Sequence, residues 1–366
     1  MAAQALHLGW HNPVRISWGS GVLHTLPLHQ PSVVLADRAA LSETNACFLR
    51  DTLGAHCAAW AWYEGGLATV GKARQLCQAL WPAMQRQPGT TVIALGGGST
   101  LDLAKAVRYR LADAALCART WRNNQLPEVY ERHPLWLLPT TAGTGSEVTR
   151  WATLWDTDAQ PAVKQSWSPL DGFAEYAIVD PDLTLSCPLL QSRDCALDTL
   201  AHALESLWNK NSNPITEALA LEAARIVIAQ LPILLQVQDA YAPRVALARA
   251  SVLAGLAMSQ TQTALAHALS YDLTLHEKMP HGHACAVWLP MAWELAQKAS
   301  SDCAALLARV FQDTSTPGAL HLHQWLIGLG VSPRDLRTTL DGRERLKLEL
   351  GSTRGRNFIG SPTQTA

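Results

Sequence analysis

The sequence lacks several features that would place it in common classes of protein. It has no uninterrupted apolar stretch long enough to span a bilayer. Its 29 basic and 30 acidic side chains nearly balance, and no run of Lys or Arg forms a stripe that would follow a phosphate backbone. We therefore expect neither a membrane nor a nucleic acid as its partner.

Paired cysteines and a secretory leader are also missing. The 8 cysteines include no CxxC pair, and most fall in apolar periodic segments, where a reduced thiol packs as a small hydrophobic group. The first 18 residues have no basic start before an apolar core, and His11, Asn12 and Pro13 interrupt them, so they do not resemble a signal peptide. We expect a cytoplasmic protein.

The 366 residues exceed one ordinary hydrophobic core, and this length predicts two domains. Up to about residue 181, short β-branched runs alternate with longer helical segments, which predicts a parallel sheet covered by helices on both faces. Beyond that point Ala- and Leu-rich helical periods dominate. We predict an α/β domain over residues 1–185 and an all-helical domain over residues 186–366.

The segment GGGSTLDLAK, residues 96–105, places three glycines directly after an apolar strand. Glycine lets backbone N–H groups approach a pyrophosphate, and Ser99 and Asp102 open a helix whose positive end faces the same anion. A glycine turn between a strand and a helix often needs no ligand, which is the alternative. The spacing differs from GxGxxG and favours a dinucleotide fold other than the ordinary Rossmann fold.

Two further segments are suited to a nucleotide. LPTTAGTGSEVT, residues 138–149, ends a strand with four hydroxyl groups, although a Ser/Thr-rich turn that caps the next segment is the alternative. Asp37 ends another strand, where an acidic residue would read an adenosine ribose, and a helix N-cap is the equally simple interpretation. Its neighbour Arg38 is suited to a 2′-phosphate, so both NAD and NADP stay open.

Four side chains in the second half form a candidate metal set. Asp198 and His202 lie four residues apart, which in a helix puts a carboxylate and an imidazole on one face. His267 lies in another helical segment, and His281 follows Pro280, which suits the first turn of the next helix. This mix suits Fe(II) or Zn(II). Since the chain has 13 histidines, solvated or core side chains are the alternative for each residue.

With Lys164 and IVDP at residues 178–181, these motifs resemble, in order and spacing, the iron-containing alcohol dehydrogenases over essentially the whole chain. The resemblance implies a dehydroquinate synthase-like architecture, with an N-terminal α/β dinucleotide-binding domain and an all-helical metal domain, and frequently a homodimer. It implies the metal ligands Asp198, His202, His267 and His281. For the cofactor, it implies a set made of Gly97, Gly98 and Ser99 at the pyrophosphate and of Thr140, Thr141, Thr144, Lys164 and Leu183 around the adenosine, ribose and nicotinamide.

Within that family, residues 149–156, 164–167 and 203–214 resemble enzymes that interconvert phosphonoacetaldehyde and 2-hydroxyethylphosphonate. A metal-dependent NAD(P)H oxidoreductase of this kind is our prediction. The alternatives are a general short-chain alcohol or aldehyde dehydrogenase, a dehydroquinate synthase-like lyase, and a catalytically silent relative. A phosphonate needs cationic or amide donors, and the candidates are Arg150, Lys164, Asn209, Lys210, Arg354 and Arg356.

One position departs from the family pattern. Many members have a His four residues after the third metal ligand, where it relays a proton, and this chain has Tyr271 there. The possible carriers are Tyr271, His276, His283 and a cofactor ribose hydroxyl. We assign catalytic roles to Tyr271 and His281. The hypothesis is that the metal polarises the aldehyde carbonyl while the reduced nicotinamide delivers hydride to its carbon.

Overall fold

The computed structural model describes residues 9–26, 28–160, 162–237, 240–311 and 315–360. The chain forms two compact units. The first is Pro13–Ser192, and the second comprises Arg193–Ala366 and the described residues 9–12. The division falls after Ser192 rather than near the predicted residue 185, because the intervening segment keeps contacts with the first unit. Ser186, for example, donates a hydrogen bond from Oγ to the carbonyl of Ala40 at 3.2 Å.

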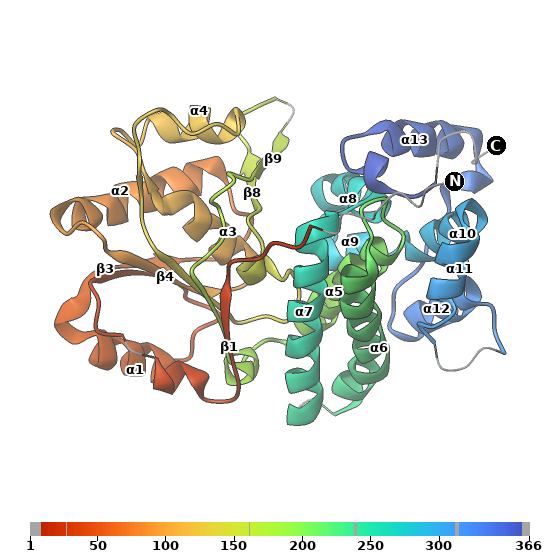
Figure 1. The fold of residues 1–366 in the computed structure, drawn as a ribbon, viewed down its shortest axis with the longest axis horizontal. Coiled ribbons are helices and arrows are strands. Elements are labelled where there is room, and N and C mark those ends of the chain that lie inside the picture. Colours follow the sequence, from red (N-terminus) through yellow and green to blue (C-terminus); the bar gives the residue numbers. More distant parts are fainter. Residues whose placement is uncertain (1–8, 27, 161, 238–239, 312–314, 361–366) are drawn as a thin grey trace. The chain divides into compact units, whose positions relative to one another are not determined.

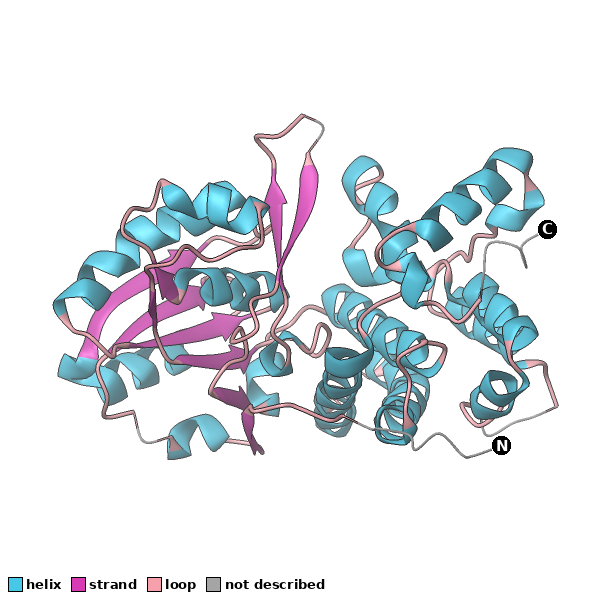
Figure 2. Ribbon diagram, turned by 45° about the horizontal axis from the view of Figure 1, so that its top comes forward, coloured by secondary structure: helices cyan, strands magenta, loops and turns pink. Residues whose placement is uncertain are grey.

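The first unit is built on one six-stranded sheet in which all the pairings are parallel. The helix α1 (Glu43–Leu53) covers one face, and α2 (Val70–Arg86), α3 (Gly98–Val107) and α4 (Leu116–Arg122) lie on the other side (Figures 1 and 2). This arrangement confirms the predicted fold of the N-terminal half. In spatial order the strands are β1 (Arg15–Trp18), β10 (Tyr176–Val179), β7 (Leu135–Pro139), β4 (Thr91–Gly96), β2 (Ser32–Asp37) and β3 (Cys57–Tyr63).

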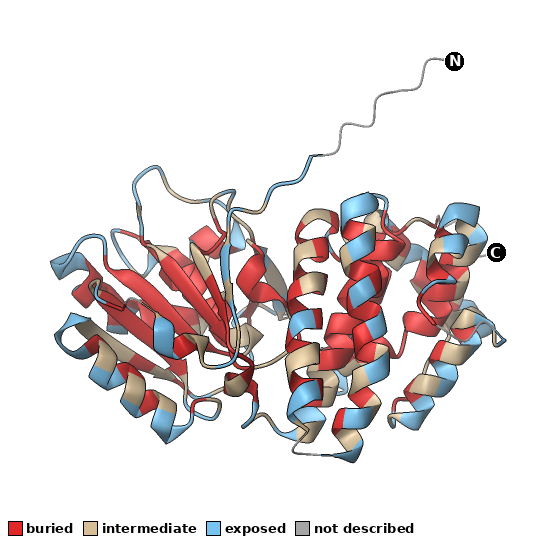
Figure 3. Cartoon of the chain, turned by 60° about the horizontal axis from the view of Figure 1, so that its bottom comes forward, coloured by how far each residue is buried: buried red, intermediate tan, exposed pale blue. Residues whose placement is uncertain are grey.

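The central strands are apolar on both sides because helices cover both faces. Along β2, Val33 and Leu35 belong to the hydrophobic cluster beneath α2 and α3, whereas Val34 and Ala36 belong to the cluster beneath α1. Figure 3 shows the central strands as buried along most of their length. The buried sheet holds the carboxyl ends of β2, β4 and β7 side by side, and the predicted nucleotide segments follow these ends.

Smaller elements complete the first unit. An antiparallel hairpin pairs β8 (Ala152–Asp156) with β9 (Val163–Trp167), and a short one pairs β5 (Tyr109–Arg110) with β6 (Glu131–Arg132). A hydrogen bond of 2.7 Å from the Trp155 amide to the carbonyl of Ala68 links the β8–β9 hairpin to the segment that precedes α2. The single-turn 3₁₀ segments are η1 (Val22–Thr25), η2 (Gly54–His56), η3 (Ser146–Val148) and η4 (Pro181–Thr184).

The regular elements that the structure describes beyond residue 192 are all helices, as predicted. The helix α5 starts in the last residues of the first unit and carries the chain into the second. The helices are α5 (Leu189–Leu207), α6 (Pro214–Gln236), α7 (Tyr241–Thr261), α8 (Leu265–His276), α9 (His281–Ala286), α10 (Leu289–Ala299), α11 (Ser301–Leu307), α12 (Gly318–Gly328) and α13 (Leu340–Gly351), with the 3₁₀ turns η5 (Leu336–Thr338) and η6 (Gly355–Asn357).

By length and composition alone, α6 is apolar enough to cross a membrane, although its apolar stretch is interrupted by charged residues. A core helix passes the same test, which makes this weak support for a membrane span. Glu222 on α6 pairs with Arg249 on α7 at 3.0 Å, and Arg225 donates a hydrogen bond from Nε to the carbonyl of Arg309 at 2.8 Å. These contacts hold α6 among its neighbouring helices.

Candidate metal and nucleotide sites

The four predicted metal ligands lie together in the helical unit. Asp198 and His202 lie one turn apart on α5, His267 is in the first turn of α8, and His281 is the first residue of α9. Asp198 Oδ1 lies 3.4 Å from the Nε2 atom of His267 and 3.9 Å from those of His202 and His281. One carboxylate oxygen therefore faces three imidazoles that come from three helices.

Gly282 allows α9 to come this close to α5. A Cβ atom at Gly282 would overlap the carbonyl oxygen of Asp194 and lie 2.8 Å from the amide nitrogen of Asp198. Any side chain at this position would push α9, and His281 with it, away from Asp198. The close contact between the two helices thus explains why a glycine follows His281.

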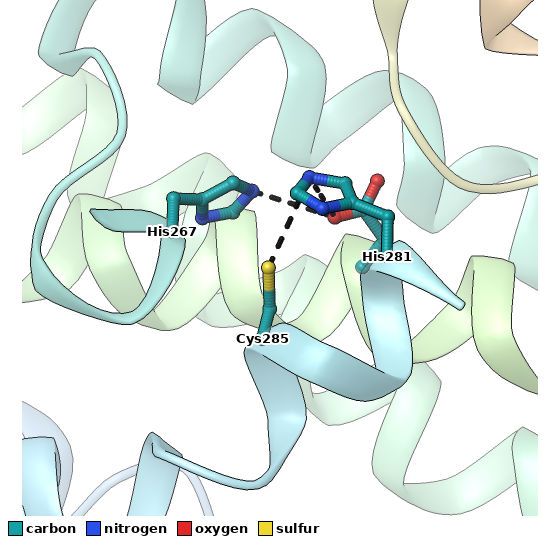
Figure 4. Close-up of side chains that lie close together, drawn as sticks. His267, His281 and Cys285 are labelled. Atoms are coloured by element: carbon teal, nitrogen blue, oxygen red, sulfur yellow. Dashed lines mark hydrogen bonds and ion pairs between the residues drawn. The ribbon is translucent and has the colours of Figure 1, made fainter. Parts of the chain in front are cut away.

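A cysteine that the sequence analysis did not single out lies at the same place. Cys285 is fully buried on α9, and its Sγ is 3.9 Å from Nε2 of His281. Figure 4 shows His267, His281 and Cys285 directed toward one another. One donor atom from each of Asp198, His267, His281 and Cys285 lies within 4.8 Å of the others. The signal in the sequence was the spacing of four residues from His281 to Cys285.

The donor set fits a divalent cation. Asp198 and His267 are 4% and 1% exposed, yet Asp198 Oδ1 and His267 Nε2 make no hydrogen bond. These two atoms lie 3.4 Å from each other as an ion pair. A buried polar atom without a hydrogen bond costs free energy, and a cation bonded to both atoms would reduce that cost. Carboxylate oxygen with imidazole nitrogen suits Fe(II) and Zn(II).

The electrostatics of the cluster follow from burial and from the mutual charges. Burial alone would raise the pKa of Asp198, but His202, His267 and His281 hold it well below its usual range. Burial lowers the pKa of His202 to about 4, so this imidazole is neutral at pH 7. A neutral imidazole beside an ionised carboxylate is the protonation state that metal binding requires.

Glu205 orients His267 and was also missed by the sequence analysis. Its buried carboxylate accepts hydrogen bonds from the amides of Ala264, Ala266 and His267 at the start of α8. Oε2 also lies 2.7 Å from Nδ1 of His267, so Nε2 is left to face Asp198. Glu205 lies on α5 two turns after Asp198, and this spacing on the face that also carries His202 was the available signal.

Tyr271 lies one turn after His267 on α8, beside Arg354. The guanidinium carbon of Arg354 lies 5.4 Å from the centroid of the Tyr271 ring, and Nη1 donates a hydrogen bond of 2.7 Å to Oγ1 of Thr263. Burial raises the pKa of Tyr271, although the charge of Arg354 opposes this. The positive charge of Arg354 also contributes to the low pKa of His202, so this guanidinium lies close to the predicted metal ligands.

The other predicted substrate residues lie in different surroundings. Asn209 is buried and binds backbone groups, donating to the carbonyl of Gln262 and accepting from the amide of Asn211. Arg356 is exposed, and its Nε donates to the carbonyl of Gly351. Two further candidates, Lys210 and Arg150, also contact other groups. Lys210 Nζ donates a hydrogen bond to the carbonyl of Arg356. Arg150 belongs to the α/β unit, where its guanidinium carbon lies 5.5 Å from the centroid of the Trp151 ring.

The two remaining histidines considered as proton carriers are directed differently. His283 Nδ1 lies 3.2 Å from Nη2 of Arg193 and 3.7 Å from Oδ1 of Asp194. His276 is exposed at the end of α8. Tyr271, in contrast, lies one turn after His267 on the same helix.

The predicted pyrophosphate loop joins β4 to α3. Gly97 is the N-cap of α3, and a Cβ atom at Gly98 would lie 2.5 Å from Cγ2 of Thr144. A Cβ atom at Gly97 would lie 3.4 Å from Oγ1 of Thr141. The glycine loop and the threonine-rich loop are thus in direct contact. The buried Oγ1 of Thr140, in the threonine-rich loop, makes no hydrogen bond.

Asp102 and Lys105 hold these loops together from beneath. Asp102 accepts hydrogen bonds from Oγ of Ser146 at 2.7 Å and from the amide of Thr153 at 2.8 Å, so both its oxygens bind the protein. Lys105 is 1% exposed and donates from Nζ to the carbonyls of Ser146 and Trp151. Burial lowers the pKa of Lys105 to about 8. Asp102, predicted as a cofactor contact, therefore lies where it positions the loop.

The remaining cofactor residues differ in their surroundings. Asp37 accepts a hydrogen bond from the amide of Ala39, and since Ser42 is the N-cap of α1, Asp37 does not cap this helix. Oδ2 of Asp37 lies 3.5 Å from Oγ1 of Thr100 on α3, so this carboxylate is next to the glycine loop. The side chain of Leu183 is buried in the sheet core, and Lys164 Nζ lies 5.5 Å from the ring of Trp155.

A parallel sheet with a glycine loop at its carboxyl edge, together with a helical unit that holds an Asp and three His, defines a two-domain fold with a candidate nucleotide site and a candidate metal site. Sequence comparison agrees. Residues 34–181 match the iron-containing alcohol dehydrogenases, and residues 193–326 match the C-terminal part of the Fe-containing alcohol dehydrogenase family. The chain belongs to the iron-containing alcohol dehydrogenase family.

Individual relatives have several different names. The chain is 35% identical over 206 residues to 1-propanol dehydrogenase from Citrobacter freundii, which covers 56% of this chain and 51% of that protein. It is 30% identical over 258 residues to sulfoacetaldehyde reductase from Bilophila wadsworthia, which covers 68% and 64%. The match thus spans about half the length of the first relative and somewhat less than two thirds of the second.

Solved structures cover nearly the whole chain. Sulfoacetaldehyde reductase from Bifidobacterium kashiwanohense, solved in complex with NAD⁺, has a TM-score of 0.80 at 26% identity, over 97% of this chain and 95% of that one. A 1,3-propanediol oxidoreductase has a TM-score of 0.81 at 20% identity, over 98% and 97%, which shows the shared fold.

Proposed function

We propose that this chain is a metal-dependent NAD(P)H oxidoreductase that interconverts an aldehyde and a primary alcohol. The observation that carries the proposal is the convergence of His202, His267 and His281 on one oxygen of Asp198. These four residues would hold Fe(II) or Zn(II), which when bound supplies a Lewis acid for the substrate oxygen.

The protein groups then have separable tasks. Glu205 holds His267 in place through Nδ1, and Tyr271 would donate a proton to the substrate oxygen. In the α/β unit, Gly97, Gly98 and Ser99 take the pyrophosphate, and Thr140, Thr141, Thr144, Lys164 and the backbone at Leu183 border the rest of the nucleotide. Asp37, at the end of β2, takes the adenosine ribose.

The substrate we propose is a short aldehyde with an anionic group, in particular phosphonoacetaldehyde. Arg354 supports this because its charge acts on His202, and a guanidinium group is suited to binding an anionic group. The sulfoacetaldehyde reductases among the relatives act, by their names, on another two-carbon anionic aldehyde. An uncharged alkanal is the second candidate, because a relative is named as a 1-propanol dehydrogenase.

A panel of aldehydes tests both candidates. Phosphonoacetaldehyde, sulfoacetaldehyde, acetaldehyde and butanal are each reduced with NADH and with NADPH, before and after metal removal and with Fe(II) or Zn(II) restored. We expect a higher kcat/KM for an anionic aldehyde and loss of turnover without metal. Equal rates with and without metal would contradict the mechanism, and a preference for butanal would favour the second candidate.

Replacing Arg354 makes the test residue-specific. Arg354→Ala is expected to raise KM for the anionic aldehyde, because a hydrogen bond between charged groups contributes about 1.5–3 kcal/mol. The KM for acetaldehyde, which has no anionic group, should change by no more than about 2-fold. The matched control is Arg356→Ala, which removes an exposed guanidinium from the same segment. Equal loss with both aldehydes would mean that Arg354 has only a structural role.

The NAD or NADP preference, the homodimer and the cytoplasmic location also belong to this proposal. Light scattering of the purified protein tests the dimer. The cofactor arms of the panel test the preference, and we expect NADH to be favoured because the carboxylate of Asp37 repels a 2′-phosphate.

A further inference from the structure

We propose that Cys285 is itself a metal ligand and that its thiolate biases the site toward zinc over iron. The inference rests on the proposed function, since it concerns the same cation. It adds sulfur to a donor set that otherwise contains only nitrogen and oxygen.

The first support is geometric. Cys285 follows His281 by one turn of α9, which puts the thiol and the imidazole on one face. Its Sγ lies within 4.8 Å of the donor atoms of Asp198, His267 and His281. Donor atoms at about 2.0–2.3 Å from one zinc ion lie roughly 3–4 Å apart, so small side-chain adjustments close this set.

The second support is what the thiol faces. A buried cysteine usually packs as a small hydrophobic group, but Sγ of Cys285 is directed at the imidazole of His281. The nearby Oδ1 of Asp198 and Nε2 of His267 are buried polar atoms that make no hydrogen bond. Because these atoms and the sulfur converge, the cysteine belongs to a set that could hold a cation.

The chemical consequence is selectivity. Thiolate is a soft ligand that favours zinc and cobalt, whereas imidazole and carboxylate also suit Fe(II). As the S–H bond breaks and the metal–sulfur bond forms, the thiol proton leaves to solvent. The thiolate and the carboxylate of Asp198 then balance the two charges of the cation.

Cobalt substitution tests the proposal without using activity. Cobalt-loaded wild-type protein is expected to show a thiolate-to-cobalt charge-transfer band in the near ultraviolet. Cys285→Ser should lose this band and keep the visible bands of bound cobalt. The matched control is Cys303→Ser, which alters another buried cysteine of the same unit, on α11, and should keep the band.

The outcomes separate this inference from the proposed function. Bound cobalt without a charge-transfer band in the wild type, or a band that survives in Cys285→Ser, overturns the sulfur ligand and leaves the metal site intact. A wild-type protein that binds no metal overturns both. If Cys285→Ser does not fold, X-ray absorption of the zinc-loaded wild type decides, because one sulfur at about 2.3 Å is expected and a shell of only nitrogen and oxygen overturns the proposal.

Discussion

Among single residues outside the proposed ligands, Glu205 holds one of the ligands in place. It accepts three backbone hydrogen bonds at the start of α8 and also binds Nδ1 of His267. One carboxylate therefore fixes both the helix that carries His267 and the ring that faces Asp198. Partners of this kind raise the basicity of a ligating imidazole and limit its rotation.

Replacing Glu205 should weaken metal binding. Glu205→Gln keeps the size of the side chain but replaces one acceptor oxygen with an NH₂ group, so we expect zinc affinity to fall about 10–100-fold. A competition titration with a fluorescent chelator measures the affinity. Glu222→Gln on the surface of α6 is the matched control and should leave the affinity unchanged. An unchanged affinity in Glu205→Gln would mean that His267 needs no fixed partner.

Glu147 gives the protein a pH dependence of a definite sign. Burial raises its pKa from 4.5 to about 7. The folded state therefore holds more protons than the unfolded state between these values, and the free energy of unfolding falls as the pH rises through them. Charged Glu147 destabilises the fold above about pH 7, by an amount on the order of 3 kcal/mol at about 1.4 kcal/mol per pKa unit.

Urea unfolding of Glu147→Gln at about pH 5 and pH 8 tests this sign. We expect the substitution to have a small effect at the lower pH and to stabilise at the higher pH, so that the fall in unfolding free energy becomes smaller. Glu128→Gln changes an exposed carboxyl in the same unit and should keep the wild-type dependence. The same pH slope in Glu147→Gln and wild type would show that another group is responsible.

Among the elements, the close approach of α9 to α5 decides whether the metal site exists. Gly282→Ala is expected to lose metal affinity, because its Cβ would lie 2.8 Å from the amide of Asp198 and displace His281. The overpacking should also destabilise the protein by about 1–3 kcal/mol. Gly328→Ala at the end of α12 is the matched control, since no atom lies within 4 Å of the added Cβ. Metal titration and thermal unfolding measure both effects, and normal metal affinity in Gly282→Ala would contradict this account.

This approach also explains how much of the site the sequence predicts. The pair Asp198 and His202 could be predicted because a helix fixes the relation of residues four apart. The parallel sheet could be predicted because β-branched runs such as that of β2 alternate with helical periods. The nearness of Cys285 to Asp198 could not, because it depends on the contact between α9 and α5. That contact belongs to the tertiary structure, and the periodicity of the local sequence does not predict it.

The substrate residues show the same limit. Asn209 lies in a segment that resembles the phosphonate enzymes and Arg354 does not, but both are polar candidates for binding a phosphonate, and the sequence does not distinguish their roles. In the structure Asn209 is satisfied by the backbone of Gln262 and Asn211, whereas Arg354 lies over Tyr271 near the histidines. Arg354 lies in the turn that follows α13, and single sequence motifs do not predict that this turn packs against Tyr271.

For the whole molecule, the division into two units predicts that the metal ion stabilises the helical unit and that the nicotinamide cofactor stabilises the α/β unit. The candidate metal ligands all lie in the helical unit, and the glycine loop lies in the α/β unit. A ligand that binds only the folded state stabilises it, by about 2.7 kcal/mol at 100 times its Kd. Metal removal should therefore loosen α5, α8 and α9 first, because these three helices carry the proposed metal ligands.

Hydrogen exchange on the zinc-loaded and chelator-treated protein measures this directly. We expect chelation to lower Tm and to increase amide exchange in α8 and α9, with β4 and α3 nearly unchanged. NADH added to the metal-free protein should instead protect the segment from β4 to α3, because backbone amides of the glycine loop would bind the pyrophosphate. Uniform loss of protection in both units after chelation would show that the chain unfolds as one cooperative body. In that case the metal would be a global stabiliser rather than a local one.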